Sequence, residues 1–252
     1  MKKIMITTMN HKLYEQYGTR LIESHKETQQ LLPLHVFIED YENVGKFTKQ
    51  ELIHYHNLFE LEPECKAFAE RNQSKPATNF FEQAIRFSYK VFAQSAARKF
   101  GDKVYYIDSD CVFHIQFPPE WYDKCLPDDK FISFYDRPSQ YTETGFVAFN
   151  NTPNNNHSIC NQFFNAYRDW YVTDKVYTIN KLEKNFWTDC HTLDGTRQMF
   201  KDNPAYIEKI LGDGKNGHIM ARDKFINPYI DHRKGPRKKQ SNSPEWRKNN
   251  DR

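Results

Sequence analysis

Cysteine is sparse and scattered in this sequence of 252 residues, which contains five cysteines and no C-x-x-C pair. The odd count disfavours a disulfide framework or a zinc ribbon, and reduced thiols are expected. No apolar run is long enough to span a membrane, and the apolar stretch after Met1 is too short for a signal peptide. We therefore expect a cytoplasmic protein, in a host cytoplasm if a phage encodes it, with no membrane span.

Apolar residues make up only 38% of the chain, but 20 Phe, 15 Tyr and 4 Trp supply large side chains for a core. The length suits one large α/β domain or two small ones. No internal repeat and no interdomain linker is visible. We expect a single catalytic domain over residues 1–239 and a basic, flexible tail over residues 240–252.

Charge is distributed unevenly along the chain. Residues 233–252 contain eight Lys/Arg and two Asp/Glu, a net charge of +6, so the remainder carries −3 within the total of +3. A phosphate-bearing partner near the C-terminus is one interpretation. A solvated, disordered tail is the other, and we favour it from Gln240 onward.

Strand and helix patterns alternate along the chain. Helices are predicted over 10–30, 64–71, 80–100 and 158–171, and Gly101 is expected to end the third with a left-handed cap. Strands are predicted over 3–8, 34–38, 104–107, 131–135, 145–149 and 176–179. This order predicts an α/β fold, with a mainly parallel central sheet and helices on both faces.

The strand at Val104–Ile107 leads directly into two carboxylates, Asp108 and Asp110. Two acids at the end of a buried strand are costly unless a cation balances them. Carboxylate oxygens suit Mg or Mn, and open α/β sheets bind ligands at the carboxyl ends of their strands. The alternative is that the pair only caps a turn before Phe113.

A second motif lies more than a hundred residues later, in the basic segment Asp231–Lys238. His232 stands three residues before Gly235 and six before Lys238. An imidazole can complete an oxygen-rich metal site, Gly235 can let the backbone approach phosphates, and Lys238 can neutralise a diphosphate.

The D-x-D aspartates together with His232-x-x-Gly235-x-x-Lys238 resemble the metal-dependent, glycogenin-like glycosyltransferases of the GT-A fold (Rossmann-like nucleotide-diphospho-sugar transferases). The segments Thr144–Asn150 and Trp187–Leu193 also resemble family segments, and Cys190 stands where the family has glutamine. The resemblance implies a hexosyl- or pentosyltransferase that uses a nucleoside-diphosphate sugar, with UDP expected, and retains the anomeric configuration.

The resemblance also implies roles for individual residues. Asp108, Asp110 and His232 are expected to hold Mn or Mg, and Lys238 to meet the diphosphate of the donor. Asp189 is the acid expected beside the anomeric carbon, and Glu143 is a candidate partner of the acceptor hydroxyl. Asp108, Ser109, Gly145 and Gly235 are also expected to contact the donor.

Further donor contacts are predicted from position rather than from the resemblance. Thr7 and Thr8 follow the first strand and Asp40 follows the second, where the base and ribose are expected, and Arg86 and Lys90 lie one helical turn apart and could face the diphosphate sugar. The alternatives are a helix cap for the threonines, a turn for Asp40, and ordinary surface charge for Arg86 and Lys90.

The acceptor is predicted from charge rather than from a motif. The basic segment begins at a predicted metal ligand, which suits a polyanion, and hydroxymethylated pyrimidine in DNA, as in phage DNA modification, is our leading interpretation. The alternative acceptor is a cell-surface glycan precursor.

Two further classes of protein remain open at this stage. Asp108–Val112 matches the D-x-D-x-[TV] motif of haloacid-dehalogenase-like phosphatases, and Gly212–Gly217 is similar to their late acidic loop. A non-enzymatic nucleic-acid-binding protein would explain the basic tail but not the buried acids.

Overall fold

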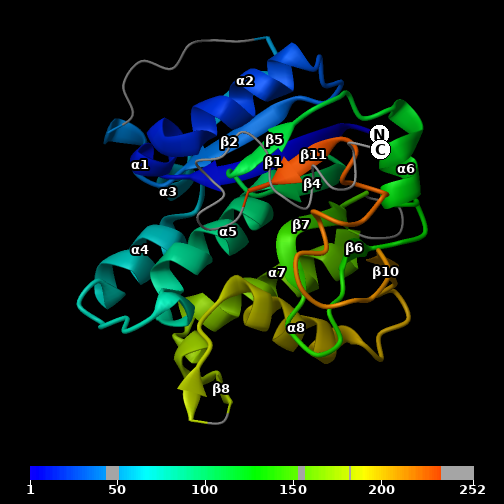
Figure 1. Ribbon diagram of the computed structural model, residues 1–252. Helices are drawn as coiled ribbons and strands as arrows, with labels where there is room; N and C mark the ends of the chain where they lie inside the picture. Colours follow the sequence, from blue (N-terminus) through cyan, green and yellow to red (C-terminus); the bar gives the residue numbers. More distant parts are fainter. Residues whose placement is uncertain (44–50, 153–156, 182, 234–252) are drawn as a thin grey trace.

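A seven-stranded sheet forms the centre of the computed structural model, which describes residues 1–43, 51–152, 157–181 and 183–233 (Figure 1). The strands lie in the order β10-β6-β7-β4-β1-β2-β3. Their bounds are β1 Lys3–Met9, β2 Leu34–Ile38, β3 Ile53–Asn57, β4 Lys103–Ile107, β6 Ile132–Tyr135, β7 Glu143–Asn150 and β10 Glu208–Leu211.

Strand direction determines which chain ends meet at each edge of the sheet. β1 is parallel to β2 and β4, β2 is parallel to β3, and β6 is parallel to β10. β7 is antiparallel to both of its neighbours, β4 and β6. The first residues of β7 therefore lie beside the carboxyl end of β4.

Two small sheets accompany the central one. β5 (Cys111–Phe113) pairs antiparallel with β11 (Ile230–His232), and β8 (Asn180–Lys181) pairs with β9 (Lys184–Asn185). The first of these joins the chain just after the D-x-D motif to the end of the described chain.

Helices connect most of the strands. The α-helices are α1 His11–Leu13, α2 Thr19–Glu27, α3 Leu58–Leu61, α4 Pro63–Asn72, α5 Ala84–Ala97, α6 Pro119–Cys125, α7 His157–Val172 and α8 Asp189–Phe200. A π-helix, η1 (Tyr14–Gly18), and three short 3-10 helices, η2 (Tyr41–Asn43), η3 (Phe80–Glu82) and η4 (Lys175–Thr178), complete the described elements.

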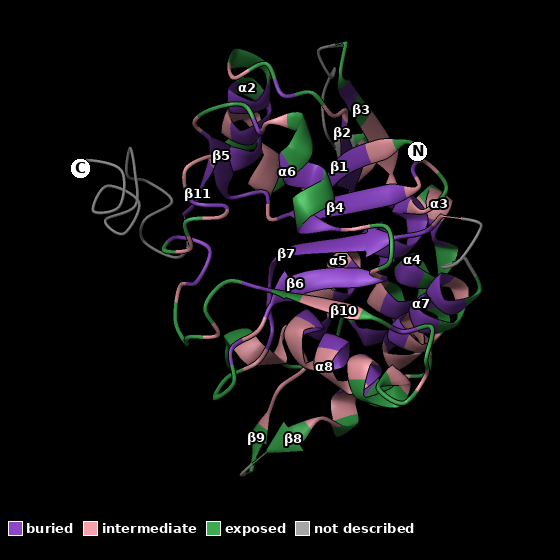
Figure 2. Cartoon of the chain, turned by 90° about the vertical axis from the view of Figure 1, so that its right-hand side faces the viewer, coloured by how far each residue is buried: buried purple, intermediate pink, exposed green. Residues whose placement is uncertain are grey.

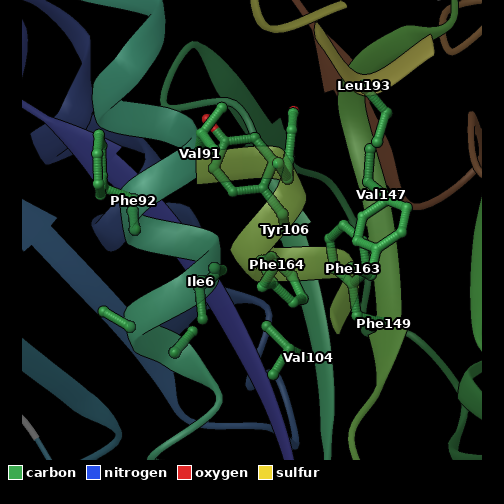
Figure 3. Packing of buried hydrophobic residues seen from close by; sticks show 14 of the residues in the cluster. Ile6, Val91, Phe92, Val104, Tyr106, Val147, Phe149, Phe163, Phe164 and Leu193 are labelled. Atoms are coloured by element: carbon green, nitrogen blue, oxygen red, sulfur yellow. The ribbon is translucent and has the colours of Figure 1, made fainter. Parts of the chain in front are cut away.

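The core lies on both faces of the sheet because side chains alternate along each strand. On β4, Val104 and Tyr106 join a cluster with α5, α7 and α8, whereas Tyr105 and Ile107 join a second cluster with α2 and α6. Figure 2 shows the buried central strands with more exposed helices around them, and Figure 3 shows the packing of the first cluster. Burial on both faces explains why the central strands are mostly apolar and do not alternate between apolar and polar residues.

The predicted α/β fold is confirmed, with β7 antiparallel within an otherwise mainly parallel sheet. The helix predicted over 10–30 is divided into α1, η1 and α2. In the helix predicted over 80–100, the first residues form η3 and the α-helix α5 covers only Ala84–Ala97. Five of the six predicted strands are present in the central sheet.

Two local predictions are wrong. The strand predicted over 176–179 is the 3-10 helix η4: Asp174 precedes it with a left-handed φ of 60°, and Tyr177 stacks on Phe68 of α4 instead of pairing in a sheet. Gly101 does not have the left-handed conformation. A side chain there is excluded for another reason, because a Cβ would lie 2.9 Å from Cγ1 of Ile4.

Candidate active site

A cleft of about 1080 Å³ opens at the carboxyl ends of β1, β2 and β4. Nine of the predicted site residues line it, namely Thr8, Arg86, Lys90, Asp108, Ser109, Asp110, Glu143, Asp189 and His232. These side chains come from segments spread over more than two hundred residues of sequence, so the fold gathers them at one site.

The D-x-D motif forms the turn between β4 and β5. The backbone N–H of Cys111 donates to the carbonyl of Asp108 at 3.1 Å, and the N–H of Asp108 donates to the carbonyl of Gly145 at 3.0 Å. The hydroxyl of Tyr106 donates to Oδ1 of Asp108 at 3.0 Å. The turn therefore both caps the strand and directs carboxylates into the cleft.

His232 reaches the same turn through the small sheet. It pairs with Cys111 across β5 and β11, and the N–H of Arg233 donates to the carbonyl of Asp110 at 3.2 Å. Its Nε2 atom lies 3.2 Å from Oδ1 of Asp110 and 3.4 Å from Oδ2 of Asp108. Antiparallel pairing thus brings the imidazole to both aspartates.

This donor set fits a small divalent cation. Ligands at right angles around Mg, at about 2.1 Å from it, are about 3 Å apart, close to the separations between this imidazole and the two carboxylates. Carboxylate and imidazole ligands also suit Mn. Among the described residues, the three side chains whose ligand atoms all lie within 4.8 Å of one another are Asp110, Cys111 and His232, and Asp108 is not in this group. Mg and Mn prefer oxygen to thiol ligands.

Lys90 of α5 links the D-x-D turn to Asp189. Its Nζ atom lies 2.8 Å from Oδ1 of Asp108 and 2.9 Å from Oδ2 of Asp189. Burial by itself would lower the pKa of Lys90, but the two carboxylates outweigh burial and raise that pKa well above its ordinary value. Lys90 is therefore a permanent cation between two acids.

Asp189 is the first residue of α8, and only 1% of its side chain is exposed. Thr188 caps this helix by accepting a hydrogen bond from the N–H of His191, and its hydroxyl also lies 2.8 Å from Nδ1 of that ring. The next residue, Cys190, lines the cleft with its Sγ atom 3.0 Å from Oγ1 of Thr144. Burial raises the pKa of the Cys190 thiol, so Cys190 is a neutral thiol near pH 7.

Glu143 is buried in an ion pair that sequence reasoning missed. Nη1 of Arg137 donates to its Oε2 at 3.0 Å, and the backbone N–H of Gly145 donates to its Oε1 at 3.0 Å. No motif singled out Arg137, since an arginine in a polar loop has no distinguishing pattern. The role of Glu143 at an acceptor hydroxyl stays a prediction.

The other end of the cleft is formed after β1 and β2, where Thr8 and Glu39 lie together. The Thr8 hydroxyl donates to the carbonyl of Phe37 at 3.0 Å and lies 3.4 Å from Oε1 of Glu39. Burial raises the pKa of Glu39 to about 8, and the nearby charge of Asp40 contributes. Sequence reasoning chose Asp40, but Asp40 accepts a hydrogen bond from the N–H of His11 at the start of α1.

Not every predicted site residue lines the cleft. Thr7, Asp40 and Gly145 are described but are absent from its lining, although Gly145 contacts both His232 and Glu143. Gly235 and Lys238 lie outside the described residues. Their predicted roles in donor binding stay predictions.

Comparison with known proteins places the chain near solved glycosyltransferase structures. No family model and no curated protein matches its sequence. Mouse xyloside xylosyltransferase 1 superposes with a TM-score of 0.49 at 11% identity, over 84% of this chain and 86% of that one. The WbbM bifunctional glycosyltransferase gives 0.47 at 13% identity, over 89% of this chain but only 42% of that protein. At these values the function has to be argued from the site itself.

Among the helices that the structure describes, none has the length and apolar character needed to cross a lipid bilayer.

Proposed function

We propose that this protein transfers a sugar from a nucleoside-diphosphate donor, expected to be a UDP-sugar, to an acceptor hydroxyl, with the help of Mn or Mg. One observation carries the proposal. His232, more than a hundred residues after the D-x-D motif, has its Nε2 atom 3.2 Å from Oδ1 of Asp110 and 3.4 Å from Oδ2 of Asp108, and all three residues line a large cleft.

Asp108, Asp110 and His232 would hold the cation. When bound, it supplies positive charge that stabilises the diphosphate leaving group. The two carboxylates and the imidazole are held by a turn and by strand pairing, so little reorganisation is needed for binding. The predicted contacts of Lys238 and Gly235 with the diphosphate belong to the same proposal.

Lys90 and Asp189 mark where the transferred sugar would lie. Asp189 is almost fully buried, so an ionised carboxylate there needs the ammonium of Lys90 at 2.9 Å. Lys90 also pairs with Asp108, so a single ammonium fixes the position of Asp189 relative to the D-x-D turn. Arg86, one helical turn earlier, lines the same cleft and suits the donor phosphates.

Glu39 and Thr8 are the side chains best placed to bind the base or ribose. Oε2 of Glu39 is buried and has no hydrogen-bond partner within the described residues. An unsatisfied buried carboxyl is costly, and a bound nucleoside would supply the missing partner. The volume of the cleft, at the upper end of the roughly 300–1,000 Å³ of ordinary ligand pockets, leaves room for donor and acceptor together.

For the acceptor, we propose hydroxymethylated pyrimidine in DNA. The support is the net charge of residues 233–252, which follow His232 in the sequence, and the character of the residues that line the cleft. Phe80 is 51% exposed and lines the cleft, with the guanidinium of Arg86 5.4 Å from its ring centroid. Exposed aromatic rings near cations stack bases regardless of sequence. A cell-surface glycan precursor remains the competing acceptor.

The phosphatase hypothesis receives less support from the same geometry. It requires residues 212–217 near the aspartates, but none of these described residues lines the cleft, and Asp213 pairs with Lys215 at 3.2 Å. It also gives His232 no role. Phosphate release from small phosphoesters that is lost in Asp108→Asn would restore this hypothesis.

A melting-temperature screen of nucleotide sugars, with and without Mn, tests the proposed function. A donor present at about 100 times its Kd should raise the Tm by roughly 5–10 °C, because ligand binding stabilises the folded state. The shift should require Mn and should disappear in Asp110→Ala and His232→Ala. If no nucleotide sugar shifts the Tm in the presence of metal, the transferase proposal is wrong.

A further inference from the structure

The Arg137–Glu143 ion pair lies beside the metal-binding side chains. Arg137 is 6% exposed and Glu143 2%, and they are joined by a hydrogen bond of 3.0 Å. Arg137 also donates to the carbonyls of Tyr141 at 2.8 Å and Thr142 at 3.3 Å. A buried pair is costly to form unless its remaining polar atoms are satisfied, which these contacts achieve.

Glu143 uses its second oxygen to hold the backbone of Gly145. The N–H of Gly145 donates to Oε1 of Glu143, and the carbonyl of Gly145 accepts from the N–H of Asp108, both at 3.0 Å. The peptide groups on both sides of this glycine are therefore fixed, one by the ion pair and the other by the D-x-D turn.

The imidazole of His232 packs directly on Gly145. A Cβ at this position would lie 2.5 Å from Cε1 of His232 and 2.9 Å from Oε1 of Glu143. Since His232 is 2% exposed, its ring has little room to move away. The position of the Gly145 backbone therefore determines where the imidazole stands relative to Asp108 and Asp110.

An irregularity in the sheet explains why this backbone needs a side-chain clamp. The pairing of β6 with β7 shifts register between Phe134 and Tyr135, so that Tyr135 lies opposite Glu143. Such bulges interrupt the ladder of backbone hydrogen bonds and redirect side chains, often beside functional sites. Glu143 satisfies the Gly145 N–H at the irregular end of β7.

We propose that Arg137 and Glu143 are positioning residues that hold Gly145, and through it His232, in the geometry that binds the divalent cation. The inference rests on the metal site of the proposed function. It gives Glu143 a role distinct from contact with the acceptor hydroxyl, and the two roles predict different measurements.

The affinity of the 252-residue chain for Mn distinguishes the positioning role of Glu143 from a role at the acceptor hydroxyl. It is measured by electron paramagnetic resonance of free Mn. Glu143→Gln keeps an oxygen for the Gly145 N–H but loses the charge that orients it on Arg137. We expect its Mn affinity to fall by roughly 10–100-fold, as for other residues that orient metal ligands. Arg137→Met with Glu143→Gln removes both charges and should lose affinity to a similar extent while avoiding an unpaired buried ion.

Two further variants calibrate the measurement. Gly145→Ala places a methyl group where the imidazole lies, so the fall in its Mn affinity measures the effect of displacing His232 directly. Glu62→Gln is the matched control: it disrupts a mostly buried ion pair with Arg168 of 3.1 Å, and neither residue lines the cleft. It should lower the Tm but leave Mn affinity unchanged.

The possible failures are distinguishable. If the wild-type protein binds no Mn, the metal site itself is wrong, and both the proposed function and this inference fall. If the wild type binds Mn and the double variant, with a cooperative melt, binds it equally well, the positioning role alone is overturned. A rise in acceptor KM at unchanged Mn affinity would assign Glu143 to the acceptor instead.

Discussion

Single residues in the cleft are organised by charges that balance one another. Lys90 lies between Asp108 and Asp189, and Arg137 pairs with Glu143. Glu39 differs from these acids because it is buried and pairs with no cation in the described part of the chain. Its carboxyl therefore keeps its proton, which makes the stability of the protein depend on pH.

We predict that Glu39→Gln abolishes a pH-dependent loss of stability. The pKa of Glu39 is raised from 4.5 to about 8, mainly by burial, so the folded protein retains a proton that the unfolded chain releases between these values. The free energy of unfolding should therefore fall, by at most about 1.4 kcal/mol per pH unit, as the pH rises through this window. Below pH 4 Glu39 adds no pH dependence to the free energy of unfolding, because it is protonated in both the folded and the unfolded state.

Urea denaturation of wild type and Glu39→Gln between pH 5 and pH 8 measures this difference. The glutamine variant should gain stability relative to the wild type as the pH rises. Parallel profiles for the two proteins would show that folding does not raise the pKa of Glu39.

The ends of secondary-structure elements carry the side chains of the candidate site. The carboxyl end of β4 leads to Asp108, the short β5–β11 pair brings His232 to it, and α8 begins with Asp189. Such ends are where backbone groups are unsatisfied and where capping side chains act. The start of α8 is therefore a point at which local stability and the site are coupled.

Thr188→Ala should destabilise the protein by about 0.5–2 kcal/mol, because Thr188 caps α8 at the N–H of His191. Thr188→Ser retains the hydroxyl and should restore most of that stability. Chemical denaturation gives both values. If the alanine variant is as stable as the wild type, the hydroxyl does not stabilise the helix.

At the scale of the whole molecule, the cleft lies along one edge of the central sheet, and the basic segment of residues 233–252 follows His232 in the sequence. The sheet order places the carboxyl ends of β1, β2 and β4 side by side, and antiparallel β7 brings Glu143 and Gly145 to the same edge. Residues 240–252 and the proposed boundary at residue 239 lie outside the described residues, so the role of that tail is open to direct test.

Deleting residues 240–252 should weaken binding to duplex DNA and leave nucleotide-sugar hydrolysis intact, if the tail contacts the acceptor. The segment contributes three of the basic residues, Arg247, Lys248 and Arg252, against Glu245 and Asp251, so the loss should be modest and should shrink at high salt. Fluorescence anisotropy with hydroxymethylated duplex at two salt concentrations measures it. Loss of hydrolysis together with binding would place the tail in the catalytic domain.

Local pattern was sufficient to predict much of this protein. Continuous apolar runs predicted the buried strands, and period 3.6 predicted α4, α5 and α7, since both depend on neighbouring residues. The two aspartates and the distant histidine were chosen as metal ligands because carboxylates at the end of a buried strand require a cation. The strand β11 escaped notice because three residues acquire strand character only by pairing with β5.

Contacts between segments that are distant in sequence determined which side chains face the cleft and which pair with one another. Glu39 and Asp40 both follow β2, but Glu39 lines the cleft whereas Asp40 accepts a hydrogen bond from the N–H of His11, a difference that their adjacent positions in sequence do not reveal. Likewise, the sequence alone cannot show that Arg137 clamps Glu143 or that His232 packs on Gly145. The chemistry of the site follows from residue types, but the separations that make them act together exist only after the sheet has formed.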